Sequence, residues 1–257
     1  MSETQEPVKK PSFFWGITEG GRALLELGSY LPYRMLNKLP KDGDGHPVLI
    51  LPGFLASDFS TIPLRSFVDK LGYTVYGWGQ GRNLANEEYV DLLLEKVDKI
   101  HEKHQSKISI IGWSLGGIYA RQLGKEKPEK IRQIITLGSP FKGLTEPNNV
   151  RWLYDLLNKG EGLSHVTPEL IADIPNPAPV PTTAIYSKQD GVVPWQFCME
   201  EQENEIHQNI EVTGSHLGYA VNHQVLEIVA DRLKYREENW VHFKSEKSLY
   251  QKFFFPC

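Results

Sequence analysis

A serine set between two glycines is the feature of this chain best suited to chemistry. The segment Gly-Trp-Ser-Leu-Gly at residues 112–116 follows an apolar run and precedes a segment of helical character. Ser114 therefore falls at a sharp turn from a strand into a helix, where Gly112 and Gly116 supply neighbours without side chains. Such a turn exposes the hydroxyl above a sheet, which favours Ser114 as a nucleophile. An ordinary surface turn is the alternative interpretation.

The segment resembles the nucleophile elbow of the α/β-hydrolase superfamily, and within it the lipase and esterase branch. Three further stretches match the superfamily in the same order along residues 46–233. They are Leu-Pro-Gly-Phe at 51–54, Asp-Gly-Val-Val-Pro at 190–194 and Gly-Ser-His at 214–216. The resemblance implies an acyl-enzyme formed on Ser114, with a histidine as base and an acid that orients it. The Pro-Gly-Phe stretch departs from the His-Gly that many esterases carry at this loop.

His216 is the predicted base. A serine hydroxyl is a weak nucleophile until a base accepts its proton, and α/β-hydrolases carry the acid and the histidine after the serine. Functional groups of open α/β sheets gather at the carboxyl ends of strands. Of the eight histidines, His216 directly follows an expected strand, 209–212. The others precede Ser114, or lie before a strand, in a helix, in the tail or in an insertion.

Asp190 is the predicted acid. It follows the expected strand 182–186 and precedes His216 by 26 residues, which leaves room for one helix and one strand. The Asp-Gly pair that it forms is also common in ordinary turns. Asp173 is the second candidate, but it lies in a proline-rich segment, and Asp231 follows the histidine.

Two backbone N–H groups are predicted to bind the oxyanion of the reaction. One belongs to Leu115, which follows the nucleophile, and the other to Phe54 in the loop after the first core strand. Gly53 allows this loop to approach the substrate, and we assign Gly53 and Trp113 to the substrate pocket. A strand-ending turn with a core phenylalanine is the alternative.

Arg82 follows the second expected strand within a glycine-rich stretch, 77–83. It has two interpretations. In the functional interpretation, Arg82 binds a substrate headgroup or braces the oxyanion loop. In the structural interpretation, it is a buried arginine that ties loops together. The second interpretation is favoured.

The elements that must position these residues alternate along the chain. Strands are expected at 47–51, 74–78, 108–111, 133–137, 182–186 and 209–212, and helices at 59–71, 86–104, 118–123 and 217–233. Alternation of apolar strands with helices is typical of a mostly parallel central sheet with helices on both faces. We predict one α/β-hydrolase domain over residues 11–257.

Three segments do not follow this alternation of strands and helices. Residues 1–10 are polar and are predicted to be a disordered tail. Residues 11–40 show helical periodicity that is interrupted at Pro32, and we favour a helix packed on the main sheet over one that faces a membrane or substrate. Residues 143–181 contain no strand, and we interpret them as a small helical cap over the site. A helix docked permanently on the body is the alternative.

Composition narrows the classes of function. The chain has 257 residues, of which 40% are hydrophobic, and a net charge of −4, so nothing suggests a nucleic-acid partner. Two cysteines give no disulfide framework and no metal motif. We expect no cofactor and no metal. Without a signal-like or membrane-spanning stretch, we expect a cytoplasmic protein.

The leading prediction is a hydrolase of carboxylic esters with fairly apolar acyl groups, acting on a small-molecule or lipid ester. Acyl transfer, thioester hydrolysis and C–C bond hydrolysis on the same residues are the alternatives, because the fold does not select among them. A non-catalytic binding protein is a further alternative. Aromatic residues at 13–15 and 253–255 also suggest peripheral contact with a membrane.

Overall fold

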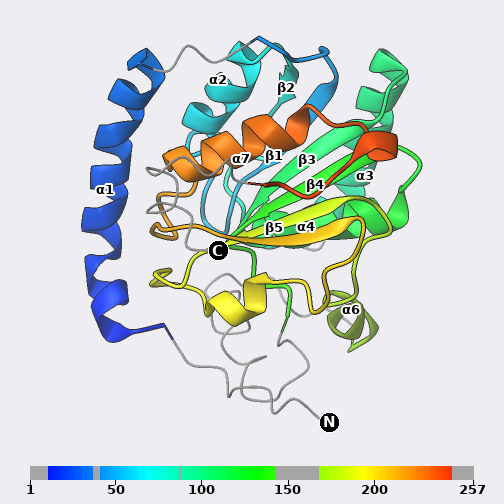
Figure 1. Cartoon of the computed structure of the whole chain (residues 1–257). Helices are drawn as coiled ribbons and strands as arrows, with labels where there is room; N and C mark the ends of the chain where they lie inside the picture. Colours follow the sequence, from blue (N-terminus) through cyan, green and yellow to red (C-terminus); the bar gives the residue numbers. More distant parts are fainter. Residues whose placement is uncertain (1–10, 37–40, 87, 143–167, 245–257) are drawn as a thin grey trace.

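A six-stranded parallel sheet forms the centre of the computed structural model, which describes residues 11–36, 41–86, 88–142 and 168–244 (Figure 1). The spatial order of the strands is β2-β1-β3-β4-β5-β6. Their bounds are β1 Pro47–Leu51, β2 Thr74–Tyr76, β3 Ile108–Trp113, β4 Ile131–Leu137, β5 Thr182–Tyr186 and β6 His207–Glu211. The predicted α/β class with a parallel sheet is confirmed.

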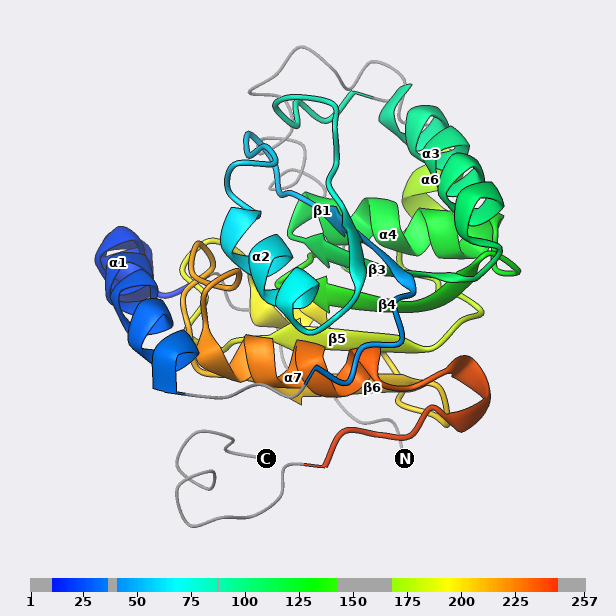
Figure 2. The ribbon, with the colours of Figure 1, turned by 90° about the horizontal axis from the view of Figure 1, so that it is seen from above.

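Helices cover both faces of the sheet. They are α1 Phe13–Leu36, α2 Ile62–Lys70, α3 Glu88–His104, α4 Leu115–Glu126, α6 Pro168–Asp173 and α7 His223–Leu233, with short 3-10 turns at Trp195–Cys198 and Glu237–Asn239. Alternate residues of β1 show the two layers: Val48 and Ile50 pack with α2 and α7, whereas Leu49 and Leu51 pack with α3 and α4 (Figure 2). Burial on both faces explains why the strands read as nearly continuous apolar runs.

The strand order places one junction at the centre of the sheet. The chain leaves β1 toward β2 on one side and then crosses back to β3 on the other, so β1 and β3 are neighbours. Crevices for ligands in open α/β sheets open where successive strands depart in opposite directions. Gly53 lies two residues after the end of β1 and Ser114 directly follows β3, so both lie at this junction.

Helix α1 differs from its prediction. It stands at the edge of the molecule and contacts α7 rather than the sheet (Figures 1 and 2). Its apolar side chains are turned to solvent: Phe13, Ile17, Leu24 and Leu25 are 82%, 65%, 70% and 76% exposed. The helix also continues through Pro32 to Leu36. The favoured prediction of an apolar face on the sheet, interrupted at Pro32, was therefore wrong.

The inward face of α1 is polar instead, which explains the reversal. Glu19 is buried, and Arg22 and Glu26 are half-buried against loops of the body. Tyr30 anchors the later part of the helix through a 2.7 Å hydrogen bond from its hydroxyl to the Pro63 carbonyl. None of the helices in the described ranges combines the length and apolar character needed to cross a membrane.

The predicted cap segment lies only partly within the described residues, since 143–167 fall outside them, as does the predicted tail at 1–10. The described part, residues 168–181, packs on the body. Lys125 of α4 forms a 2.9 Å ion pair with Asp173 at the end of α6, and Ala178 and Val180 join the core beside α4. This part of the segment therefore covers the carboxyl-terminal part of α4.

Candidate active site

Ser114 occupies a strained turn between β3 and α4. Its φ of 53° and ψ of −122° lie where residues with a side chain are rarely found. Hydrogen bonds hold the turn: the Ser114 N–H donates to the Leu137 carbonyl at 2.9 Å, and the Ser139 hydroxyl donates to the Ser114 carbonyl at 2.6 Å. The surroundings therefore impose an energetically costly backbone conformation on the residue that the sequence predicts as the nucleophile.

The glycines on either side of Ser114 are required by close packing. A Cβ added at Gly116 would lie 2.4 Å from the Leu51 carbonyl oxygen, and one at Gly112 would lie 2.4 Å from the Gly116 carbonyl oxygen. These contacts bring the start of α4 against the end of β1. The glycine spacing that carries the resemblance thus has a steric cause in this fold.

The loop after β1 lies directly beside the serine. A Cβ added at Gly53 would be 3.1 Å from the Ser114 Cβ and 3.7 Å from its hydroxyl oxygen. Within the described ranges, no hydrogen bond uses the N–H group of Phe54 or of Leu115. Two unengaged N–H groups on the segments that flank Ser114 suit the stabilisation of a negatively charged oxygen.

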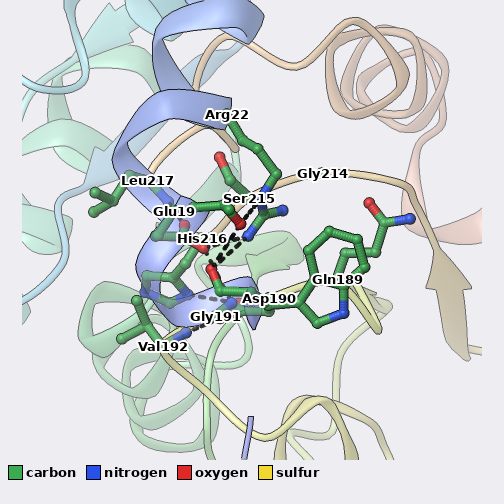
Figure 3. Close-up of polar contacts among 12 residues, drawn as sticks. Glu19, Arg22, Gln189, Asp190, Gly191, Val192, Gly214, Ser215, His216 and Leu217 are labelled. Atoms are coloured by element: carbon green, nitrogen blue, oxygen red, sulfur yellow. Dashed lines mark hydrogen bonds and ion pairs between the residues drawn. The ribbon is translucent and has the colours of Figure 1, made fainter. Parts of the chain in front are cut away.

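Asp190 and His216 are joined by a short hydrogen bond. The Nδ1 atom of His216 lies 2.6 Å from the Asp190 Oδ2 atom, and both residues are buried (Figure 3). The other carboxylate oxygen, Oδ1, accepts the N–H groups of Val192 and Val193 at 2.8 and 2.7 Å. Asp190 therefore stabilises its own turn through Oδ1 and binds His216 through Oδ2 at the same time.

Charge at the site favours the protonated form of the histidine. Burial by itself lowers the pKa of His216, but the charge and hydrogen bond of Asp190, together with the charge of Glu19, offset this, and the pKa is raised above its ordinary value of 6.5. The Trp113 indole N–H fixes the backbone of the same residue, at 3.0 Å from the His216 carbonyl. Among the described residues the hydrogen bonds include none between the Ser114 hydroxyl and the His216 ring.

Two carboxylates near the pair were missed by the sequence reasoning. Glu19 of α1 accepts the N–H groups of Gly191 and Leu217, which follow Asp190 and His216 (Figure 3). Glu26 accepts both the N–H and the hydroxyl of Ser215. The available signal was the recurrence of Glu19, Arg22 and Glu26 at helical spacing among the apolar residues of the helix.

Other candidates lie apart from this cluster. Asp173, the second candidate acid, pairs with Lys125 of α4. Arg82 is exposed, and the structure uses its carbonyl, which accepts the Tyr89 hydroxyl; the favoured interpretation as a buried arginine was wrong because its side chain extends into solvent. Within the described ranges, no group of three or more His, Cys, Asp and Glu side chains is arranged to hold a metal ion.

Comparison with known proteins supports the fold. A family model, the PGAP1-like alpha/beta domain, matches residues 78–160. No curated protein sequence is detectably similar to the chain. Among solved structures, lipase B of Aspergillus fumigatus has a TM-score of 0.59 at 18% identity over 78% of this chain, which spans only 55% of that lipase.

Two smaller proteins are covered almost completely. A monoacylglycerol lipase of Paleococcus ferrophilus has a TM-score of 0.53 at 15% identity, with coverage of 76% of this chain and 95% of that one. A lipase-esterase related protein of Clostridium acetobutylicum has a TM-score of 0.51 at 18% identity, with 76% and 96% coverage. The sheet order, the turn at Ser114 and these likenesses show that the chain has the α/β-hydrolase fold of lipases and esterases.

Proposed function

We propose that this protein is a serine hydrolase that cleaves carboxylic esters with fairly apolar acyl groups. The observation that carries the proposal is the buried 2.6 Å hydrogen bond between His216 and Asp190, in the same fold as a serine held at a positive φ. A buried carboxylate on Nδ1 leaves Nε2 of the imidazole to act as the base. Strained, buried polar groups of this kind are concentrated at functional sites.

The proposed reaction runs in two halves. The Ser114 hydroxyl attacks the ester carbonyl carbon while His216 accepts its proton, and Asp190 stabilises the resulting imidazolium. The N–H groups of Leu115 and Phe54 bind the oxyanion of the tetrahedral intermediate. His216 then gives its proton to the leaving alkoxide, and the acyl group stays on Ser114. Water, deprotonated by His216, releases the acid and regenerates the serine.

Apolar side chains around these residues support an apolar acyl group. Leu217 follows His216 and is 50% exposed, and Leu55 follows Phe54 and is 49% exposed. Both leucines adjoin proposed site residues, so we assign them to contact with the acyl group. Phe54 and Trp113 are the proposed aromatic walls of the pocket.

Replacement of the nucleophile tests the proposal. Ser114→Ala is expected to reduce hydrolysis of p-nitrophenyl esters by at least about 10⁴-fold, since the triad acts as a unit. The assay uses acyl chains of increasing length, with circular dichroism to verify that the variant is folded. Hydrolysis retained by folded Ser114→Ala protein would contradict the assignment.

A fluorophosphonate probe separates the remaining alternatives. The proposal expects one adduct on Ser114 in the wild type and none in Ser114→Ala, measured by mass spectrometry of the intact protein. Absence of the adduct in the wild type would favour a non-catalytic binding protein. An adduct without ester hydrolysis would direct attention to acyl transfer, thioester hydrolysis or C–C bond hydrolysis, which a substrate panel distinguishes.

A further inference from the structure

We propose that Glu19 of helix α1 is a positioning residue for the Asp190–His216 pair, because its single carboxylate binds the backbone that follows each of the two residues. The inference rests on the proposed function. Glu19 lies far from the other site residues in sequence, 172 residues before Gly191 and 198 before Leu217.

The bridge is formed by both carboxylate oxygens. Oε1 of Glu19 accepts the Leu217 N–H at 2.8 Å, and Oε2 accepts the Gly191 N–H at 3.0 Å (Figure 3). Leu217 follows His216 after β6, and Gly191 follows Asp190 after β5. One rigid group therefore sets the spacing between the loop that carries the acid and the loop that carries the base.

The burial of Glu19 makes this arrangement specific. The residue is only 5% exposed, and an unpaired carboxylate at such a position would be costly. Its charge is met by Arg22 at 2.7 Å as well as by the two N–H groups. Charge-assisted hydrogen bonds of this kind are short and strongly directional, which suits a positioning role.

Helix α1 also holds the histidine loop on its other side. Glu26 accepts the N–H of Ser215 at 2.8 Å and its hydroxyl at 2.9 Å. The N–H groups directly before and after His216 are thus both bound by carboxylates of one helix. The loop that carries Asp190 also packs closely on α1, since a Cβ added at Gly191 would lie 2.3 Å from the Trp15 carbonyl oxygen.

Glu19 contributes electrostatically as well. The charged groups that surround His216 are Asp190 from the loop after β5 and, from α1, Glu19 with its partner Arg22 and Glu26, while Tyr219 packs on the ring. The negative charge of Glu19 adds to that of Asp190 in raising the pKa of His216. Removing that charge is therefore expected to lower the pKa, and removing Arg22 to raise it.

Glu19→Gln in the full chain tests the role. The expected result is a fall in kcat/KM for p-nitrophenyl esters of about ten- to a hundred-fold, mostly in kcat, because the pair is misplaced rather than removed. In the wild type, kcat/KM should rise with pH through a midpoint above 6.5, and in the variant that midpoint should move to lower pH. The control is Glu95→Gln, which alters an exposed helical glutamate paired with Lys99; neither quantity should change.

NMR titration of the His216 ring provides a readout that needs no substrate. Glu19→Gln should lower the titration midpoint of this ring, and Arg22→Gln should raise it. If Glu19→Gln does not fold, Arg22→Gln still tests the charge by its opposite direction. A purely structural role would lower the melting temperature and leave both midpoints unchanged.

The two proposals fail in different ways. A wild type without hydrolysis and without a fluorophosphonate adduct would contradict the proposed function, while the titration would still decide the role of Glu19. A folded Glu19→Gln protein with wild-type kcat/KM and an unchanged His216 midpoint would overturn the positioning role alone.

Discussion

At the scale of single residues, Ser114 combines a positive φ with a side chain, and its surroundings hold it there. The Ser139 hydroxyl and the Leu137 carbonyl fix its backbone, and the close packing of Gly112 and Gly116 leaves no space for a side chain at either position. Such a conformation costs on the order of 1–3 kcal/mol. The strain belongs to the backbone, so it should persist when the hydroxyl is removed.

This strain predicts an inverted order of stability between two inactive variants. Glycine normally destabilises a protein relative to alanine by about 0.5–1 kcal/mol. At position 114, Ser114→Gly should instead be more stable than Ser114→Ala by about 1 kcal/mol, because only glycine adopts this φ without strain. Urea denaturation of both variants measures the difference. Equal stability, or a more stable alanine variant, would show that the turn is not strained.

The turn at Ser114 and the contact between Asp190 and His216 were predictable because each depends on local signals. A serine between glycines, and acids or histidines directly after strands, are visible in the sequence, and the short contact between Asp190 and His216 follows from the parallel sheet. Glu19 and Glu26 were not predictable in this way. Helical glutamates normally mark a solvated face, and their partners lie almost 200 residues further along the chain.

At the scale of elements, side-chain hydrogen bonds explain why several boundaries differ from the predictions. Strand β2 ends at Tyr76 rather than Trp78, because the carboxylate of Asp58 accepts the N–H groups of Trp78 and Gly79 at 2.8 Å each. Helix α7 begins at His223 rather than Leu217, because the Asn222 side chain caps it. Caps and turns of this kind depend on single polar contacts, which periodicity does not register.

Helix α1 is a further case in which periodicity does not predict the observed structure. Periodicity predicted the helix but not the face that it buries, since an amphipathic pattern has the same period in either orientation. Polar contacts to the loops after β5 and β6 decide the orientation, and they leave Phe13, Phe14 and Ile17 exposed. The second aromatic cluster, at 253–255, lies outside the described residues.

Peripheral contact with a phospholipid surface therefore stays a prediction, and it belongs to α1. An exposed apolar helix face binds a bilayer in proportion to its apolar area. The wild type should float with phosphatidylcholine liposomes, and Phe13→Ser combined with Phe14→Ser and Ile17→Ser should abolish flotation while ester hydrolysis in solution persists. Leu92→Ser, at an exposed leucine of α3, is the matched control. Equal flotation of the triple variant and the control would refute the idea.

At the scale of the whole molecule, a second polar cluster closes the opposite end of the sheet. His46, just before β1, contacts Ser109 of β3 at 2.8 Å through Nε2 and Asp44 through Nδ1, and Arg132 of β4 pairs with Asp44 at 2.7 Å. This network links the starts of three adjacent strands. Burial and the nearby Arg132 charge lower the pKa of His46 to about 4.

The His46 cluster predicts a loss of stability in mild acid. The folded protein keeps His46 neutral down to about pH 4, whereas the unfolded chain takes up a proton below its ordinary pKa of 6.5. The free energy of unfolding should therefore fall by up to about 3 kcal/mol between these values. Urea denaturation from pH 7 to 4 tests this. His46→Asn should flatten the dependence, whereas His242→Asn should not; equal slopes would contradict it.

The carboxylate bridge of α1 also bears on the order in which the molecule is assembled. The helix is synthesised well before its partners, Gly191 and Leu217, which lie 172 and 198 residues after Glu19. Contacts across such long stretches of chain close slowly, because the loop entropy must be overcome before they contribute. We therefore expect the central sheet to form before the helix docks, so that the site acquires its final geometry among the last events of folding.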